Sequence, residues 1–214
     1  GVGNAQLDAK TYQIGIYGSY TGTNFYVDGF ASYAGSDNDV FRSAFAENIT
    51  ASYDASQFAI GAALGAPMEV SSNVFITPNA SLTYNHYEAD SYTETGSAGF
   101  SATVNPSTAR QLTGTLGARI HAVFEQVDGT NVVPEVRVGI IGDLIDDDVV
   151  STATFVGGGT AFNVTGTDTD DLGALIGVGL ALDNALWSAG VSYDADIRSD
   201  FMSHTGRAEL RWKF

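Results

Sequence analysis

Apolar and polar residues alternate with a period of two along much of the 214-residue chain. The last stretch shows this best: its apolar members are Ala208, Leu210, Trp212 and Phe214, and its charged members are Arg207, Glu209, Arg211 and Lys213. Successive side chains of a β-strand point to opposite faces, so the alternation predicts strands with one apolar and one polar face.

We expect nine strands, and the connections between them fall into two classes of length. The expected strands lie near 12–20, 24–33, 56–65, 74–87, 110–125, 131–144, 172–182, 185–194 and 203–214. Short connections lie at 21–23, 66–73, 126–130 and 183–184, and long ones at 34–55, 88–109, 145–171 and 195–202. Short turns at one end and long loops at the other are typical of outer-membrane barrels. The pattern predicts an all-β fold, an antiparallel transmembrane β-barrel.

Charged residues on the strands indicate which face meets water. A charge on the lipid face of a barrel costs on the order of 2–4 kcal/mol at the membrane midplane. The polar faces should therefore point inward, which predicts these pore-facing residues: Arg119, Glu135, Arg137, Arg207, Glu209, Arg211 and Lys213. Aromatic residues near strand ends are typical of the girdles at the two membrane interfaces. They are Tyr20, Tyr33, Tyr84, Trp187, Tyr193, Trp212 and Phe214.

Composition narrows the classes of function. The net charge is −16, and nucleic-acid binding needs clustered cations, so we expect no nucleic-acid partner. The chain has no cysteine, which excludes disulfides and thiolate metal sites. No run of about 18 apolar residues occurs, so no transmembrane helix is predicted.

No constellation in the sequence indicates catalysis, a cofactor or a metal. His86, His121 and His204 fall on different strands or loop edges and lack the spacing of metal ligands. The run Asp146–Asp148 offers oxygen ligands of the kind that Ca²⁺ takes but lacks the EF-hand spacing, so a solvated loop is expected. Cation bridging to lipopolysaccharide is the alternative. No G-x-S-x-G elbow is present, and Gly157–Gly159 has no following Lys-Ser/Thr. We expect no enzyme.

A series of short motifs, in order along the whole chain, is similar to one family. They are Gly15-Ile16-Tyr17-Gly18-Ser19-Tyr20, Phe25-Tyr26-Val27-Asp28-Gly29, Thr77-Pro78-Asn79-Ala80-Ser81-Leu82-Thr83-Tyr84, Tyr92-Thr93-Glu94-Thr95-Gly96, Leu116-Gly117-Ala118-Arg119, Val133-Pro134-Glu135, Phe155-Val156-Gly157-Gly158 and the alternating end from Gly206 to Phe214. In this order they resemble the C-terminal β-domain of autotransporters, the translocator of type V secretion.

The resemblance implies a function and a set of partners. It implies a pore in the outer membrane of a Gram-negative bacterium that supports export of an upstream passenger to the cell surface. The implied partners are the passenger, outer-membrane lipids and lipopolysaccharide, and the barrel-assembly machinery. That machinery reads the last strand, which makes Trp212 and Phe214 the expected assembly signal.

One departure from the family concerns the number of strands. Members usually form a twelve-stranded barrel threaded by a helix, whereas nine strands are expected here and no amphipathic helix precedes Thr11. We therefore expect residues 1–214 to be one β-barrel domain that lacks its N-terminal strands, with Gly1–Lys10 in an external loop.

Two other readings stay open at this stage. One is an outer-membrane porin or adhesin-like barrel that acts through its long acidic external loops; the other is a soluble acidic β-sandwich. The translocator reading also predicts that charge reversal at Arg211 disturbs assembly more than the same change at Arg198, which falls in an expected external loop.

Overall fold

The computed structural model describes residues 5–44, 47–97, 99–166 and 170–213. The long strands are β1 (Ala5–Thr21), β2 (Tyr26–Ala44), β3 (Glu47–Gly65), β5 (Val74–Ala89), β8 (Ala109–Ala122), β10 (Asn131–Asp146), β13 (Leu172–Asp183), β14 (Trp187–Ile197) and β15 (Met202–Trp212). The short strands are β4 (Met68–Ser71), β6 (Tyr92–Thr93), β7 (Ala102–Pro106), β9 (Phe124–Glu125), β11 (Val150–Phe155) and β12 (Phe162–Thr165). Within these ranges no helix long and apolar enough to cross a membrane occurs.

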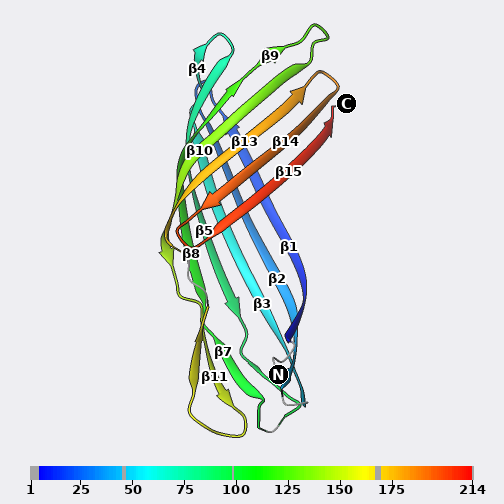
Figure 1. Cartoon of the computed structure of the whole chain (residues 1–214), viewed down its shortest axis with the longest axis vertical. Coiled ribbons are helices and arrows are strands. Elements are labelled where there is room, and N and C mark those ends of the chain that lie inside the picture. The colour runs from blue at the N-terminus through cyan, green and yellow to red at the C-terminus, as the bar shows by residue number, and fades with distance from the viewer. Residues whose placement is uncertain (1–4, 45–46, 98, 167–169, 214) are drawn as a thin grey trace.

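The nine long strands form one antiparallel sheet in which each pairs with the next long strand along the chain. The nine strands predicted from the alternation are therefore confirmed. The sheet curls strongly, as Figure 1 shows, with the C-terminus at the end that carries the short connections. Within the described ranges β1 and β15 each pair along one side, so the curled sheet has two open edges.

The strand register collects the apolar residues on one face. Leu64, Ala80, Leu116 and Ile140 are successive cross-strand partners from β3 to β10, so they form one row on that face. Leu116 is 60% exposed and Ile140 is 53% exposed. A band of apolar side chains left open on every long strand suits a surface that meets lipid hydrocarbon.

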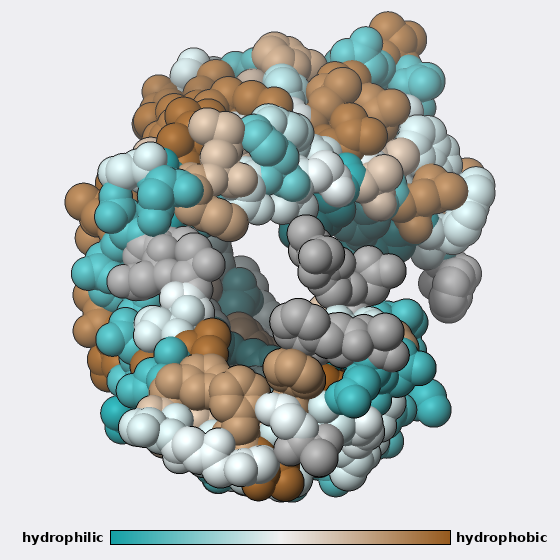
Figure 2. All heavy atoms as spheres, turned by 60° about the horizontal axis from the view of Figure 1, so that its bottom comes forward, coloured by the Kyte–Doolittle hydropathy of each residue, from teal (hydrophilic) through white to brown (hydrophobic). Residues whose placement is uncertain are grey.

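The polar face is the concave one. Asn79 on β5 and Arg207 on β15 line the same depression of about 450 Å³, although four strands separate β5 from β15 in the sheet. Strands so far apart in a sheet can meet around one space only on the inside of its curl. Figure 2 looks into the hollow that the sheet surrounds.

The predicted loop 34–55 is wrong, because β2 and β3 continue through it as a paired hairpin up to Ala44 and Glu47. The start of the chain differs in the same way: Ala5–Lys10 belongs to β1 and pairs with β2, whereas a loop was expected. These segments alternate poorly because their buried side mixes polar Asn38 with apolar Ile49 and Ala55, so no continuous apolar row marks it. Residues 1–4, the rest of that expected loop, lie outside the described ranges.

The predicted loops 88–109 and 145–171 contain a second sheet, with the order β12-β11-β7-β6. It lies at the end of the molecule opposite the C-terminus (Figure 1). The predicted loop 195–202 shortens to residues 198–201, between β14 and β15. The long connections thus lie at one end as expected, but two of them are folded.

Candidate functional site: the concave face and its external rim

A chain of ion pairs crosses the concave face from β8 to β14. Arg119 and Arg137 are direct cross-strand partners, an arrangement in which like charges repel. Glu135 lies between them: Arg119 Nε donates to Glu135 Oε2 at 2.6 Å, and Glu135 also pairs with Arg137. Arg137 Nη2 reaches Asp194 Oδ1 at 2.8 Å. The two carboxylates offset the two guanidinium charges.

Glycines on β13 make room for this chain of charges. A Cβ atom at Gly177 would collide with the Asp194 carboxylate and the Arg137 guanidinium, which meet above it. A Cβ atom at Gly179 would lie 2.8 Å from Cγ of Glu135. The lack of a side chain at Gly177 and Gly179 therefore lets β10 and β14 form an ion pair across β13, the strand between them.

Three of the predicted charges of the last strand, Glu209, Arg211 and Lys213, form ion pairs that are separate from those of Arg119 and Arg137. Glu209 accepts from Arg211 Nη2 at 2.7 Å, and both side chains are exposed. Lys213, which follows β15, donates to Asp183 Oδ1 at 2.6 Å. Arg207 lines the depression on the concave face beside Arg137 and Asp194, and it has no charged partner among the described residues. By register, Arg207, Glu209 and Arg211 pair with Ser192, Gly190 and Ser188, so they lie on the same face of the sheet as the ion pairs.

Of the two residues expected to form the assembly signal, Trp212 and Phe214, the structure describes Trp212. Trp212 is the register partner of Trp187, and the two aromatic residues lie at the same end of β14 and β15. Phe214 lies outside the described residues.

Sequence reasoning missed Asp194 as the partner of Arg137. The signal was present, since Ser188, Gly190 and Ser192 alternate with apolar residues along β14 and Asp194 continues their face. The sequence pattern does not show that Arg137 on β10 contacts Asp194 on β14 across β13. That contact depends on the strand register and on the missing side chain at Gly177.

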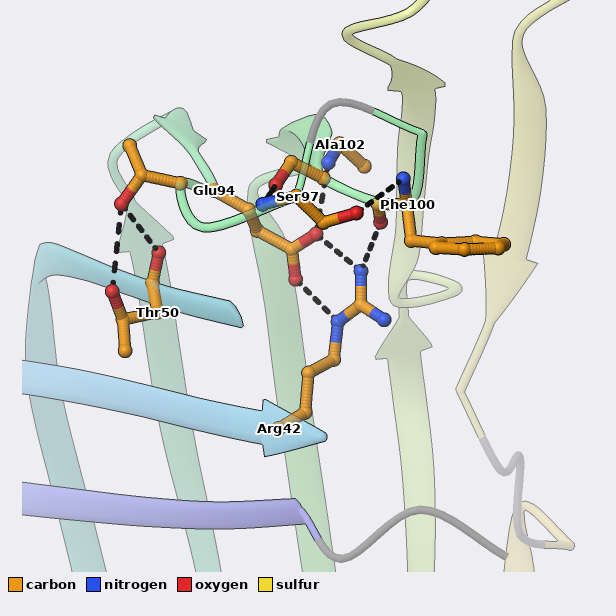
Figure 3. A network of polar contacts seen from close by, with 8 residues as sticks. Arg42, Thr50, Glu94, Ser97, Phe100 and Ala102 are labelled. Carbon is orange, nitrogen blue, oxygen red and sulfur yellow. Dashed lines mark hydrogen bonds and ion pairs between the residues drawn. The ribbon is translucent and has the colours of Figure 1, made fainter. Parts of the chain in front are cut away.

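At the end of the molecule opposite the C-terminus, a polar network ties the second sheet to the hairpin of β2 and β3 (Figure 3). Arg42 donates from Nε to Glu94 Oε1 at 2.7 Å and from Nη2 to Glu94 Oε2 at 2.5 Å. Arg42 Nη2 also donates to the Phe100 carbonyl at 2.6 Å, and the Ala102 N–H donates to Glu94 Oε2 at 2.9 Å. Glu94 is 7% exposed, so its carboxylate depends on these donors.

The surroundings of Glu94 shift its ionisation. Burial by itself raises the pKa of Glu94, but the hydrogen bonds from Arg42 and Ala102 and the charge of Arg42 outweigh burial and lower it. Two further contacts hold the same segment: Thr50 and Thr95 exchange backbone hydrogen bonds of 2.9 Å. The segment is thereby fixed against the end of β3.

Comparison with known proteins places this geometry in a family. The autotransporter beta-domain family matches the chain over residues 1–194. The chain belongs to this family. Its beta-domain lies in the outer membrane of a Gram-negative bacterium and serves as a translocator for a linked passenger. Translocator domains of this family are transport pores. The autotransporter reading replaces the soluble sandwich.

Two solved structures share the fold of this beta-domain. One is the translocator domain of the autotransporter NalP from Neisseria meningitidis, at 22% identity and a TM-score of 0.70, covering 97% of this chain and 69% of that one. The other is the beta-domain of the Bordetella autotransporter BrkA, at 18% identity and a TM-score of 0.69, covering 97% of this chain and 75% of that one. The comparison with curated protein sequences gave no match.

One arginine of the beta-domain lies elsewhere than expected. Arg198 falls in the connection between β14 and β15, where an exposed loop was predicted, yet its side chain is 7% exposed. It donates from Nη1 to Asp143 Oδ2 at 2.6 Å, and the side chain of Asp143 is fully buried. Arg198 is therefore part of the packed structure.

The three histidines of the beta-domain lie apart from one another. His121 stacks on Phe75, with ring centroids 5.1 Å apart, while the Tyr193 hydroxyl and His204 Nδ1 are 2.6 Å apart. His86 lies on β5. Across the described ranges no three His, Asp or Glu side chains gather in a way that would hold a metal ion.

Proposed function

We propose that the concave face of this beta-domain is the hydrophilic wall of the conduit that exports the linked passenger. The observation that carries the proposal is the separation of the two faces. Apolar rows such as Leu116 and Ile140 cover the convex side, while the ion pairs of Arg119, Glu135 and Arg137 lie on the concave side. A wall of this kind meets lipid on one side and water on the other.

The pairing of the inner charges suits a conduit. Glu135 bonds to two arginines, and Asp194 bonds to Arg137, so most of the charge is compensated within the wall. Such groups keep water in the lumen without presenting a strong single-sign field that would retain a charged polypeptide. In this role we place Arg119, Glu135, Arg137, Arg207, Glu209, Arg211 and Lys213 as the pore-facing residues.

The remaining partners follow from the same arrangement. We propose that the convex apolar band contacts outer-membrane lipids, and that lipopolysaccharide meets the acidic external end. The last strand, with Trp212 and the terminal Phe214, would be read by the barrel-assembly machinery. Because β15 pairs along the whole of β14, we further propose that residues 1–214 act as one domain.

The test uses the full-length autotransporter expressed in a Gram-negative host. Protease added to intact cells should digest the passenger, and the beta-domain should need detergent for extraction and change its gel mobility on boiling. Recovery without detergent and without a mobility shift would contradict the membrane assignment. A beta-domain that assembles while its passenger stays in the periplasm would favour the porin or adhesin reading instead.

A further inference from the structure

The concave face has two unlike halves. The half formed by β8 to β15 carries the ion pairs described above. The half formed by β1, β2 and β3 carries an aromatic wall, defined here as Tyr17, Phe30, Gly61 and Ala63, which borders a depression of about 380 Å³. Register places these residues on the polar, concave side, since Tyr17 pairs with Phe30, Phe30 with Gly61, and Gly61 with Thr83 of β5.

The aromatic wall is open to the lumen. Tyr17 is 91% exposed and Phe30 is 42% exposed. The Phe30 ring lies over Gly61, where a Cβ atom would collide with it, so the ring is held flat along β3. Asp28 borders the same depression, and its Oδ1 accepts a hydrogen bond from Ser19 Oγ at 2.5 Å. The wall itself consists of uncharged residues and offers aromatic surface to water.

We propose that the exported polypeptide contacts the lumen chiefly along this aromatic wall, through its own apolar and aromatic side chains. This rests on the proposed function. A polypeptide that has not folded exposes apolar side chains, and covering Tyr17 and Phe30 with them removes apolar surface from water on both partners. Contact with the other half would instead desolvate ion pairs such as Arg119–Glu135, which opposes binding there.

The weakness of such contacts matters for transport. Apolar contact is non-directional and proportional to the area covered, so it accepts many side chains in succession without requiring one sequence. A passenger segment can exchange one contact at Tyr17 for the next as it advances. The wall acts as a guiding surface for a polypeptide in transit.

Photocrosslinking in the full-length autotransporter tests the proposal. The photoreactive residue p-benzoylphenylalanine replaces Tyr17, or Ser192 as the matched control, and a reporter passenger with a disulfide-closed loop stalls export. Ser192 lies on β14 in the charged half and is half-exposed, with its register partner Gly179 on the same face. Crosslinks to the passenger should be severalfold more abundant from position 17 than from position 192.

Equal yields from the two positions, or more from position 192, would overturn the proposal. Crosslinks from position 17 that stay within the beta-domain would also overturn it, because another part of the autotransporter would then cover the wall. Failure of the unmodified protein to place any passenger at the surface would be a different result, since it contradicts the proposed function itself.

A kinetic measurement adds a second test. Tyr17→Ser should slow the arrival of the passenger at the surface severalfold in a pulse-chase experiment, with heat-modifiable barrel present in normal amount. Tyr12→Ser, on the opposite face of the same strand and 65% exposed, should leave the rate unchanged. An unchanged rate in Tyr17→Ser would count against the guiding role.

Discussion

Arg198 and Asp143, 55 positions apart in the sequence, form an ion pair of 2.6 Å in which the arginine is 7% exposed and the aspartate is fully buried. The contact crosses the start of β13, where Gly173 has no side chain to block it. It joins the connection between β14 and β15 to β10, next to the register shift between Asp143 and Ile145. A residue of a connecting segment thus anchors three strands.

Because of this buried pair, we expect charge reversal at Arg198 to lower the free energy of unfolding more than charge reversal at Arg211. Arg198→Glu would bring a second carboxylate against buried Asp143 and should destabilise the beta-domain by about 3–5 kcal/mol, the usual cost of breaking a buried pair. Arg211→Glu should cost no more than about 1 kcal/mol, because the Arg211 side chain is 69% exposed. Urea midpoints of both variants, purified from outer membranes, measure the difference. Equal midpoints would contradict the structural role of Arg198.

Gly177 should tolerate no side chain. Gly177→Ala places a methyl group between Asp194 and Arg137, so the ion pair must open or the strand must shift, at a cost of about 1–3 kcal/mol. Gly206→Ala is the matched control, since an added Cβ there meets no atom within 4 Å. The temperature at which the heat-modifiable band disappears on gels should fall for the first variant and hold for the second. A fall of equal size in both would indicate a general intolerance of alanine.

The network around Glu94 predicts an acid-sensitive external segment. The unfolded chain has the ordinary pKa of 4.5 at this residue, and the folded protein has a lower one. The ionised Glu94 therefore contributes fully to stability above pH 4.5, and this contribution is lost as the pH falls through the lowered pKa of the folded protein. The protection factors for hydrogen exchange of the Thr95 and Ala102 amides, which bond within this network, should therefore fall as the pH is lowered through this range.

Glu94→Gln serves as the control for that measurement. It keeps the shape of the side chain but cannot ionise, so the acid-induced loss of protection should disappear, while protection at neutral pH should already be reduced. Protection that is lost identically in both proteins would assign the acid effect to another group.

The assignment of the two faces predicts opposite outcomes for one change of charge. Leu116→Lys puts a cation on the convex face and should cost about 2–4 kcal/mol if that position is near the membrane midplane. Thr83→Lys puts the same cation on the concave face and should be tolerated. The fraction of protein that assembles into outer membranes reports both. Tolerance of Leu116→Lys would mean that the convex face does not meet hydrocarbon.

How much the sequence predicts depends on the solvent that each segment meets. From Gly206 to Trp212 one face lies against lipid and the other against the lumen, so the alternation is enforced and predicted β15 almost to the residue. One face of the external parts of β2 and β3 is covered by the second sheet, but the residues buried there include polar Asn38 as well as Ile49, so no apolar alternation marks these segments. Their pairing depends on contacts across the hairpin, such as Ser52 Oγ to Asp39 Oδ1 at 2.6 Å, which composition does not reveal.

The sequence by itself determined the fold class, the nine strands of the main sheet, the division into an apolar and a polar face, and the family. These follow from local alternation, because each strand separates two solvents wherever it crosses the membrane. Only the tertiary structure decided which charges pair. Arg42 meets Glu94 and Arg198 meets Asp143 through strand register and curl, and glycines such as Gly177 open the space between strands. Such contacts join residues more than fifty positions apart, and no local pattern records them.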